Sequence, residues 1–187
     1  MSQLFGPVVQ QGYVVPDVES AMQHWLARGV GPFVFVDIKD FPGIYDGQPI
    51  SAEMQAGFAY SGDQQIEVIS PSLDHPSIYQ DYLQQVPAGG LQHLAFWVDD
   101  IDAKLAELDA QQVGYRVWQR YGNPPDYQAH AYIDLTESPG VMIQLMARSD
   151  FYNMLFGALA AAAADWDGKT DPIRVLDPGS GQLIARV

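Results

Sequence analysis

Two hydrophobic patterns alternate along this chain, one repeating every second residue and the other every third or fourth residue. The first is typical of a strand with one buried face, and the second of a helix that packs along one stripe. Residues 8–26 and 89–108 each begin with the strand pattern, reach an aspartate and continue with the helix pattern. Asp17 and Asp100 are placed to cap the first helical turn by accepting its free N–H groups. Each segment is therefore predicted to be a strand followed by a helix.

These two segments are copies of one another, separated by a constant 83 residues. His93 falls on Gln10, and the apolar helical residue Leu105 falls on Met22. A repeat of this kind indicates a fold built from duplicated units.

Three more strands are predicted after each helix, at residues 32–36, 52–60 and 64–70 in the first copy and at 115–120, 128–135 and 141–147 in the second. A turn at residues 137–140 precedes the last of these strands. The final strands of the two copies match at a separation of 77 residues, so the second copy is shorter. The longer loop 37–51 of the first copy accounts for the difference. The pattern thus predicts two tandem βαβββ modules.

The remaining segments connect or follow the modules. A helix is predicted to start at Pro76 in the connector. Another is predicted from about residue 150 to residue 165, packed on the outer side of the sheet or on another chain, and a short hairpin is placed around "DPGSG". We expect one domain over residues 1–187, made of a first module at 7–71, a connector at 72–90, a second module at 91–148 and a C-terminal helix and tail at 149–187.

Composition narrows the classes of function. The 187 residues are 48% hydrophobic and include no cysteine, so a core can form without disulfide bonds, and thiolate chemistry is excluded. The formal net charge of −14 argues against binding to nucleic acid or anionic membranes, because phosphate binding needs clustered Lys and Arg. No stretch has the pattern of a signal peptide or a membrane span. We therefore expect a cytoplasmic protein that acts on a small molecule.

Four polar residues occupy matched positions in the two copies. Gln10 and His93 lie on the first strands, and Glu67 and Gln144 lie between apolar neighbours on the last strands. Alternation places all four on the face opposite those neighbours, where a two-fold repeat would bring them together. One imidazole, one carboxylate and two amide oxygens can hold a divalent metal of intermediate hardness. The alternative is that the four are unrelated residues on half-exposed strands.

Other residues are candidates for binding a substrate. The loop 37–51 carries Phe41, Ile44 and Tyr45, which suggests a lid or wall over an apolar ligand, with local packing as the alternative.

Three residues of the second copy are further candidates. Tyr121 and Tyr127 are placed to wall the other side of such a site. His130 is also a candidate, although an imidazole that donates to a neighbouring carbonyl would explain it equally well.

At these residues the chain resembles the vicinal oxygen chelate superfamily, which includes glyoxalases, bleomycin-resistance proteins and extradiol dioxygenases. The resemblance covers about residues 7–147, through "QQGYVVPDVESAM", "QIEVISP", "LQHLAFWVDDIDA" and "PGVMIQLM". Glyoxalase I and methylmalonyl-CoA epimerase are the members that it looks most like. The resemblance implies an α+β fold in which the two βαβββ modules form a cup-shaped mixed sheet, with the C-terminal helix added.

The resemblance also implies a site. One ligand from the first and one from the last strand of each module would hold a metal, which places the ligands at Gln10, Glu67, His93 and Gln144. The metal would be Mn, Co, Ni, Fe or Zn. Gln144 departs from the family pattern, where a Glu normally stands that can leave the metal and take a proton.

Two functions of different classes follow. The first is a metal-dependent isomerase, epimerase or lyase that acts next to a carbonyl of a bulky apolar or acyl substrate through a metal-stabilised enolate, with Glu67 as ligand and catalytic base. The second is a non-catalytic protein that sequesters small molecules in the same fold without metal. A homodimer is the candidate assembly.

Overall fold

The computed structural model describes residues 4–136 and 140–186. Its strands form one mixed sheet in the order β10-β9-β2-β3-β4-β1-β5-β8-β7-β6. The first module contains β1 (Gln10–Val14), α1 (Val18–Leu26), β2 (Phe33–Tyr45), β3 (Gln48–Ser61) and β4 (Gln64–Pro71). The second contains β5 (Gly90–Val98), α3 (Ile101–Ala110), β6 (Tyr115–Tyr121), β7 (His130–Leu135) and β8 (Met142–Ala147). The other elements are α2 (Ile78–Gln85), α4 (Asp150–Ala164), β9 (Ile173–Leu176) and β10 (Leu183–Ala185).

The predicted fold class is confirmed, because the two modules have the same internal strand order. β2-β3-β4-β1 in the first module corresponds to β6-β7-β8-β5 in the second, and β1 pairs with β5 in antiparallel fashion between them. In addition, β2 pairs with β6, so the sheet curves back on itself as a cup. The exact module boundaries stay a prediction, and residues 137–139 of the predicted turn at 137–140 lie outside the described residues.

Strand register preserves the separations seen in the sequence. Across β1 and β5, Gln10 lies opposite Ala95 and Gly12 lies opposite His93. Beside them, Gly12 pairs with Glu67 on β4, and Ala95 pairs with Gln144 on β8. The second set of pairs therefore repeats the first at the separations of 83 and 77 residues.

The helices of the two modules cover the outer face of the sheet. Val18 and Met22 of α1 pack with Val68 of β4, and Ile101 of α3 packs with Leu145 of β8. Side chains alternate along a strand, so the neighbours of Val68 and Leu145 face the inside of the cup. The predicted caps are confirmed, because Asp17 and Asp100 each accept a backbone N–H of the first turn at 2.6 Å.

The loop predicted at residues 37–51 is wrong, because this segment is a long β-hairpin. β2 and β3 remain paired out to Tyr45 and Gln48, joined by Asp46 and Gly47. Both turn residues have positive φ, 45° and 76°, which suits a two-residue hairpin turn and which Asp and Gly adopt readily. The far end of β2 then has backbone partners on both sides, since it also pairs with β6.

Two predictions about helices are also corrected. α2 begins at Ile78 behind a Ser77 cap, so Pro76 precedes the cap and is not the first helical residue. α4 lies neither on the outer side of the sheet nor on another chain. Its Leu155 and Leu159 pack with Val34 and Phe58 of the first module, inside the cup.

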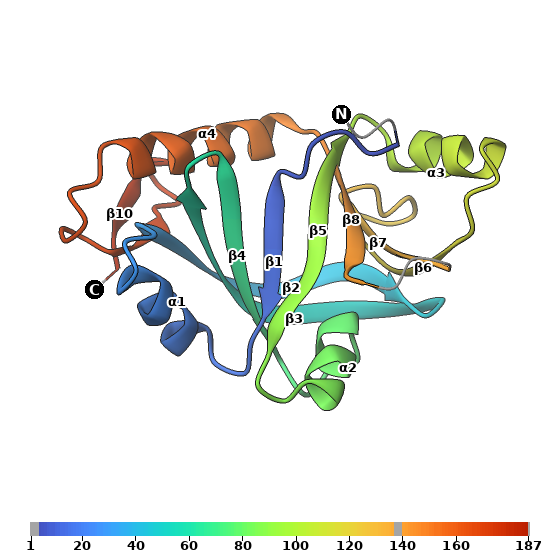
Figure 1. The fold of residues 1–187 in the computed structure, drawn as a ribbon, viewed down its shortest axis with the longest axis horizontal. Coiled ribbons are helices and arrows are strands. Elements are labelled where there is room, and N and C mark those ends of the chain that lie inside the picture. The colour runs from blue at the N-terminus through green and yellow to red at the C-terminus, as the bar shows by residue number, and fades with distance from the viewer. Residues whose placement is uncertain (1–3, 137–139, 187) are drawn as a thin grey trace.

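Figure 1 shows α4 along the top of the view and α2 at the bottom, with strands of both modules between them. The hairpin predicted around "DPGSG" is confirmed as β9 and β10, and β9 extends the sheet by pairing with β2. Among the helices of residues 4–136 and 140–186, none combines the length and the apolar character that a membrane span requires.

The packing of α4 on the sheet generates a stability prediction. Leu159 is 2% exposed, so Leu159→Ala is expected to lower the free energy of unfolding by about 2–4 kcal/mol through lost burial and a residual cavity. Leu73→Ala is the control, because Leu73 is 69% exposed and its truncation should change stability little. Urea denaturation of both variants measures the effect, and equal stabilities would contradict the described docking of α4.

Candidate functional site

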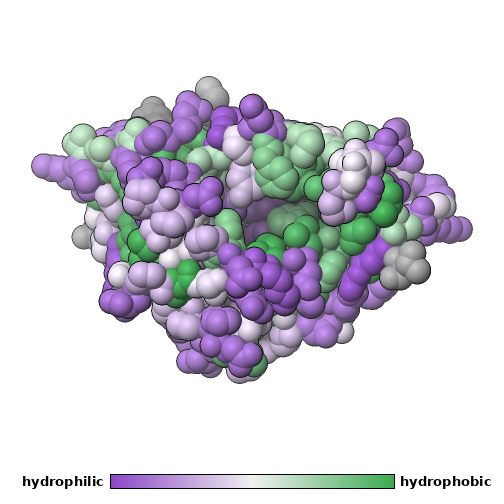
Figure 2. All heavy atoms as spheres, turned by 180° about the vertical axis from the view of Figure 1, so that it is seen from behind, coloured by the Kyte–Doolittle hydropathy of each residue, from purple (hydrophilic) through white to green (hydrophobic). Residues whose placement is uncertain are grey.

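The inside of the cup encloses a cavity of about 550 Å³. Its walls come from β strands of both modules, from Tyr79 of α2, and from Tyr152 and Leu155 of α4. Figure 2 shows a hollow near the middle of the molecule, with hydrophobic residues around much of its rim. Apart from a few polar groups, the lining consists of aromatic and aliphatic side chains, which suits a small apolar ligand.

The four matched polar residues are buried around one region of this cavity. Gln10, Glu67 and Gln144 line it, and they are 1%, 7% and 1% exposed. His93 is fully buried, with Nε2 3.2 Å from Glu67 Oε2. This contact crosses β1 above Gly12, where a Cβ atom would lie 2.0 Å from the imidazole. The absence of a side chain at Gly12 therefore allows Glu67 and His93 to meet.

The amide nitrogens of both glutamines are held away from ligand-binding duty. Gln10 Nε2 donates to Gln65 Oε1 at 2.6 Å. Gln144 Nε2 donates to the Tyr132 hydroxyl at 2.7 Å and lies 3.1 Å from His130 Nδ1. The oxygens Gln10 Oε1 and Gln144 Oε1 are buried without a hydrogen-bond partner. Buried unpaired acceptors are costly, so the geometry suits a ligand that accepts their lone pairs.

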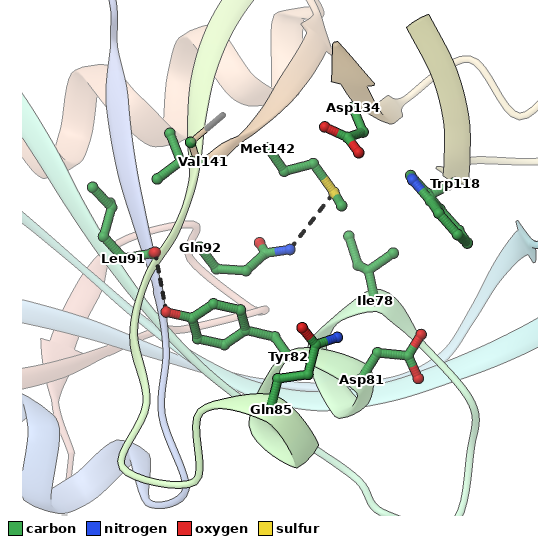
Figure 3. Close-up of a pocket in the computed structure, with 11 residues that line it drawn as sticks. Ile78, Asp81, Tyr82, Gln85, Leu91, Gln92, Trp118, Asp134, Val141 and Met142 are labelled. Atoms are coloured by element: carbon green, nitrogen blue, oxygen red, sulfur yellow. Dashed lines mark hydrogen bonds between the residues drawn. The ribbon is translucent and has the colours of Figure 1, made fainter. Parts of the chain in front are cut away.

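A β-bulge orients His93. The β1–β5 register shifts between Gly12 and Tyr13, which pair with His93 and Leu91, so Gln92 is the extra residue. Its Oε1 lies 2.7 Å from His93 Nδ1, and its Nε2 lies 3.6 Å from the sulfur of Met142, a contact drawn in Figure 3. Since a thioether has no proton to donate, the amide N–H faces the sulfur and the oxygen accepts Nδ1–H. In the neutral ring, the lone pair of Nε2 then faces Glu67.

This donor set fits a divalent metal. Among residues 4–136 and 140–186, no three His, Cys, Asp or Glu side chains come together to hold one, so the two amide oxygens are needed. Neighbouring ligands of a metal with bonds of about 2.0–2.1 Å lie roughly 3.0–3.4 Å apart. The Glu67 and His93 atoms are 3.2 Å apart. Two atoms that both offer lone pairs at this distance would be stabilised by a cation that both can ligate.

A network of neutral aromatic groups covers the other side of the cavity. The Tyr79 and Tyr132 hydroxyls lie 2.5 Å apart, and His130 Nε2 lies 2.6 Å from the Tyr152 hydroxyl. Burial, with a smaller contribution from His93, lowers the pKa of His130 to about 4, so its imidazole is neutral at physiological pH. Burial raises the pKa of Tyr152 to about 12 and raises the pKa values of Tyr79 and Tyr132 well above their usual range.

The residues predicted to contact substrate divide into two groups. Phe41, Tyr121 and His130 line the cavity. The partners of the His130 ring are Tyr152 and Gln144, so the alternative of a neighbouring carbonyl is wrong.

The prediction is wrong for Ile44, Tyr45 and Tyr127, which do not line the cavity. Ile44 pairs with Arg120 near the hairpin end, and the Tyr45 hydroxyl is bonded to Asp81 of α2. Tyr127 lies in the loop between β6 and β7. All three were placed on a loop or beside one, and the long hairpin directs the first two elsewhere.

Sequence reasoning missed the contribution of the C-terminal segment. Tyr152 and Phe156 of α4 line the cavity, as does Val175 of β9. The available signal was the pair of aromatic residues lying off the buried Leu155 and Leu159 stripe of the helix.

Comparisons with known proteins support the fold. The chain is similar to methylmalonyl-CoA epimerase from Mycobacterium tuberculosis, with 19% identity over 82% of this chain and 95% of that chain and a TM-score of 0.53. A hypothetical protein from Bacillus halodurans C-125 shows 15% identity over 77% of this chain and 95% of that chain, with a TM-score of 0.55. A variant of Streptomyces coelicolor methylmalonyl-CoA epimerase in complex with 2-nitronate-propionyl-CoA shows 16% identity over 78% and 96%, with a TM-score of 0.52.

At these identities the structural similarities establish the fold alone. No curated protein matches the chain. The profile of one family matches residues 9–133, which is more than half of the sequence and includes Gln10, Glu67 and His93. The chain belongs to the glyoxalase/bleomycin resistance protein/dioxygenase superfamily.

Proposed function

We propose that this protein is a metal-dependent isomerase or epimerase, or a lyase of the same chemistry, that removes a proton from the carbon next to a carbonyl. The observation that carries the proposal is the set of buried lone pairs around the cavity. Gln10 Oε1 and Gln144 Oε1 have no partners, and the Nε2 of His93 faces Glu67. The solved methylmalonyl-CoA epimerases of similar fold provide an example of this reaction class.

Gln10, Glu67, His93 and Gln144 would hold the metal. When bound, a divalent ion supplies Lewis-acid chemistry that stabilises negative charge on a carbonyl oxygen. The chain's own residues supply the remaining functions. Gln65 and Gln92 orient Gln10 and His93, and the apolar walls exclude water from the reacting carbon.

Glu67 is the candidate base. Its carboxylate lines the cavity and is only 7% exposed, next to the buried His93. Gln144, at the matched position of the second module, has no carboxylate and cannot accept the proton. The two sides of the site are therefore chemically unequal, and proton abstraction is assigned to the side of the first module. Glu67 would leave its place as a ligand to act.

The lining favours an uncharged reacting group. Asp37, Glu67 and His130 are the titratable residues of acidic or imidazole type on the cavity wall, and no Lys or Arg among the described residues lines it. An apolar ketone or the acyl part of a thioester fits this lining. Phosphate groups of a larger substrate would stay outside the cavity, because no cation inside it would pair with them.

A sequestering protein is the second candidate, favoured by the predominantly apolar lining of the cavity. In that function, affinity for a ligand comes from burial against Phe41, Phe58 and similar side chains and does not depend on metal. The unpaired amide oxygens are what the sequestering function does not explain. A homodimer stays a prediction for either function.

Metal binding is the first test. Chelator-treated protein is titrated with Mn²⁺, Co²⁺, Ni²⁺, Fe²⁺ and Zn²⁺ while Tm is recorded, since a ligand that binds only the native state must raise stability. We expect at least one ion to raise Tm in a saturable manner. A constant Tm with all five ions would argue for the sequestering function.

Substitution of the candidate ligands is the second test. His93→Ala and Glu67→Gln should weaken metal binding and abolish α-proton exchange, which is measured as deuterium incorporation into a panel of ketones and acyl thioesters in D₂O. Gln144→Glu should bind metal more tightly, because it adds a negative charge beside an ion. Gln85→Glu adds the same charge on the exposed part of α2 and serves as the matched control. Equal metal affinity in all four variants would contradict the assignment of the ligands.

Gln92 generates a third prediction, because its oxygen fixes the imidazole tautomer of His93. Gln92→Leu should weaken metal binding by roughly 10- to 100-fold, the usual effect of losing such a partner. In the metal-free variant, ¹⁵N NMR should show a mixture of His93 tautomers in place of a predominant Nδ1–H form. Gln119→Leu is the control, since Gln119 is equally buried but bonds to the backbone of α2. Unchanged metal affinity in Gln92→Leu would refute this role.

A further inference from the structure

The Tyr121 hydroxyl has no hydrogen-bond partner although the residue is 1% exposed and lines the cavity. Its ring is held firmly in place. Phe41 stacks on it at 4.9 Å between ring centroids, and the other contact is Gly43, where a Cβ atom would lie 2.7 Å from the ring. A rigid, buried and unpaired hydroxyl is costly in a protein interior. Such a group is explained by a ligand that accepts its proton.

The Tyr79–Tyr132 pair also has an unused proton. The two hydroxyls lie 2.5 Å apart, and one of their two protons forms the bond between them. The other neighbour of the Tyr132 oxygen is Gln144 Nε2, at 2.7 Å, which donates and so cannot accept the second proton. That proton is therefore free to enter a hydrogen bond with a molecule in the cavity, which both tyrosines line.

Donors and acceptors stand on different elements around this cavity. Hydroxyl protons come from Tyr79 of α2, Tyr121 of β6 and Tyr132 of β7, whereas the unpaired acceptors are the amide oxygens of Gln10 on β1 and Gln144 on β8. A metal satisfies only the acceptors. The donors need an acceptor atom without charge, because no cation among the described lining residues would balance an anionic ligand.

We propose that Tyr121 and the Tyr79–Tyr132 pair donate hydrogen bonds to the carbonyl oxygen of an uncharged ketone or acyl group bound in the cavity. This assignment rests on the proposed function and adds the groups that hold the substrate oxygen. When a base removes the neighbouring C–H proton, the electron pair of that bond moves toward the carbonyl oxygen, and the same O–H groups stabilise the enolate without giving up their protons.

The protonation state of the tyrosines agrees with this role. Burial raises the pKa of Tyr121 above its ordinary range, as it does for Tyr79 and Tyr132, and the carboxylate of Glu67 adds to the effect. All three hydroxyls thus keep their protons at physiological pH and remain donors.

The test uses [carbonyl-¹³C]acetophenone and chelator-treated protein, so that metal does not contribute. The infrared carbonyl stretch of the bound ketone should lie below its value in hexane. Tyr121→Phe and Tyr132→Phe should each move the stretch back toward the hexane value and weaken binding by roughly threefold to tenfold, the usual effect of one lost hydrogen bond. α-Methylstyrene has the same shape without the oxygen, and its affinity should not change.

Stability measurements separate this role from a structural one. Tyr121→Phe removes a hydroxyl that has no partner, so Tm should stay level or rise while ketone binding weakens. Tyr115→Phe is the control, because that hydroxyl bonds to the Leu105 carbonyl on the other face of the sheet. If Tyr132→Phe does not fold, Tyr121→Phe alone decides the question.

An unchanged carbonyl stretch in Tyr121→Phe would overturn the proposal, and so would the absence of acetophenone binding to the wild-type protein. Loss of the stretch shift only in variants that also lose Tm would overturn it as well. Failure of the metal titrations with an intact carbonyl shift would remove the proposed function and leave the hydroxyl assignment standing, so the two failures are distinguishable.

Discussion

The antiparallel pairing of β1 with β5 is the contact on which the site depends. It joins two modules of the same strand order, and the local two-fold relation places Gln10 of one strand and His93 of the other on the same inner face. The parallel strands β4 and β8 flank this pair and add Glu67 and Gln144 at matched register positions. Gly12 is where these relations meet, because a side chain there would occupy the space of the His93 ring. The arrangement is symmetric in backbone but unequal in chemistry, since one module offers a carboxylate where the other offers an amide.

The cavity wall carries several polar atoms that the protein itself leaves unpaired. Each such atom lowers stability, because burial removes water without replacing it by a partner. Apolar clusters on both sides of the sheet compensate for this, with α1 and α3 packed outside and α2 and α4 packed inside. The hydrogen bonds that do form hold the non-reacting atoms of Gln10, Gln144 and His93. The protein is therefore rigid around these groups and unsatisfied only toward the cavity, which is the distribution expected of a preorganised binding site.

Much of the fold and the four polar residues could be predicted from the sequence, because duplication and strand alternation are both visible in it. The constant separation of the two copies carries the register of β1 and β5 with no knowledge of the structure. What failed has physical causes. The β2–β3 hairpin is amphipathic on both sides and long, so apolar residues such as Ile44 looked like those of a loop lying over a ligand. The unpaired hydroxyl of Tyr121 depends on distances between strands that no single sequence contains. Likewise, the bulge at Gln92 changes which neighbours face each other over a single residue.

The C-terminal helix has a consequence for how this scaffold can diversify. The prospective metal-binding groups all belong to the duplicated sheet, whereas Tyr152, Leu155 and Phe156 close the cavity from a segment added after both copies. Chemistry and ligand shape are thus encoded in separate stretches of the chain. Changes in α4 can alter the size and polarity of one cavity wall without moving a strand, so ligand preference can evolve in the appended segment while the register that positions the reactive groups is retained.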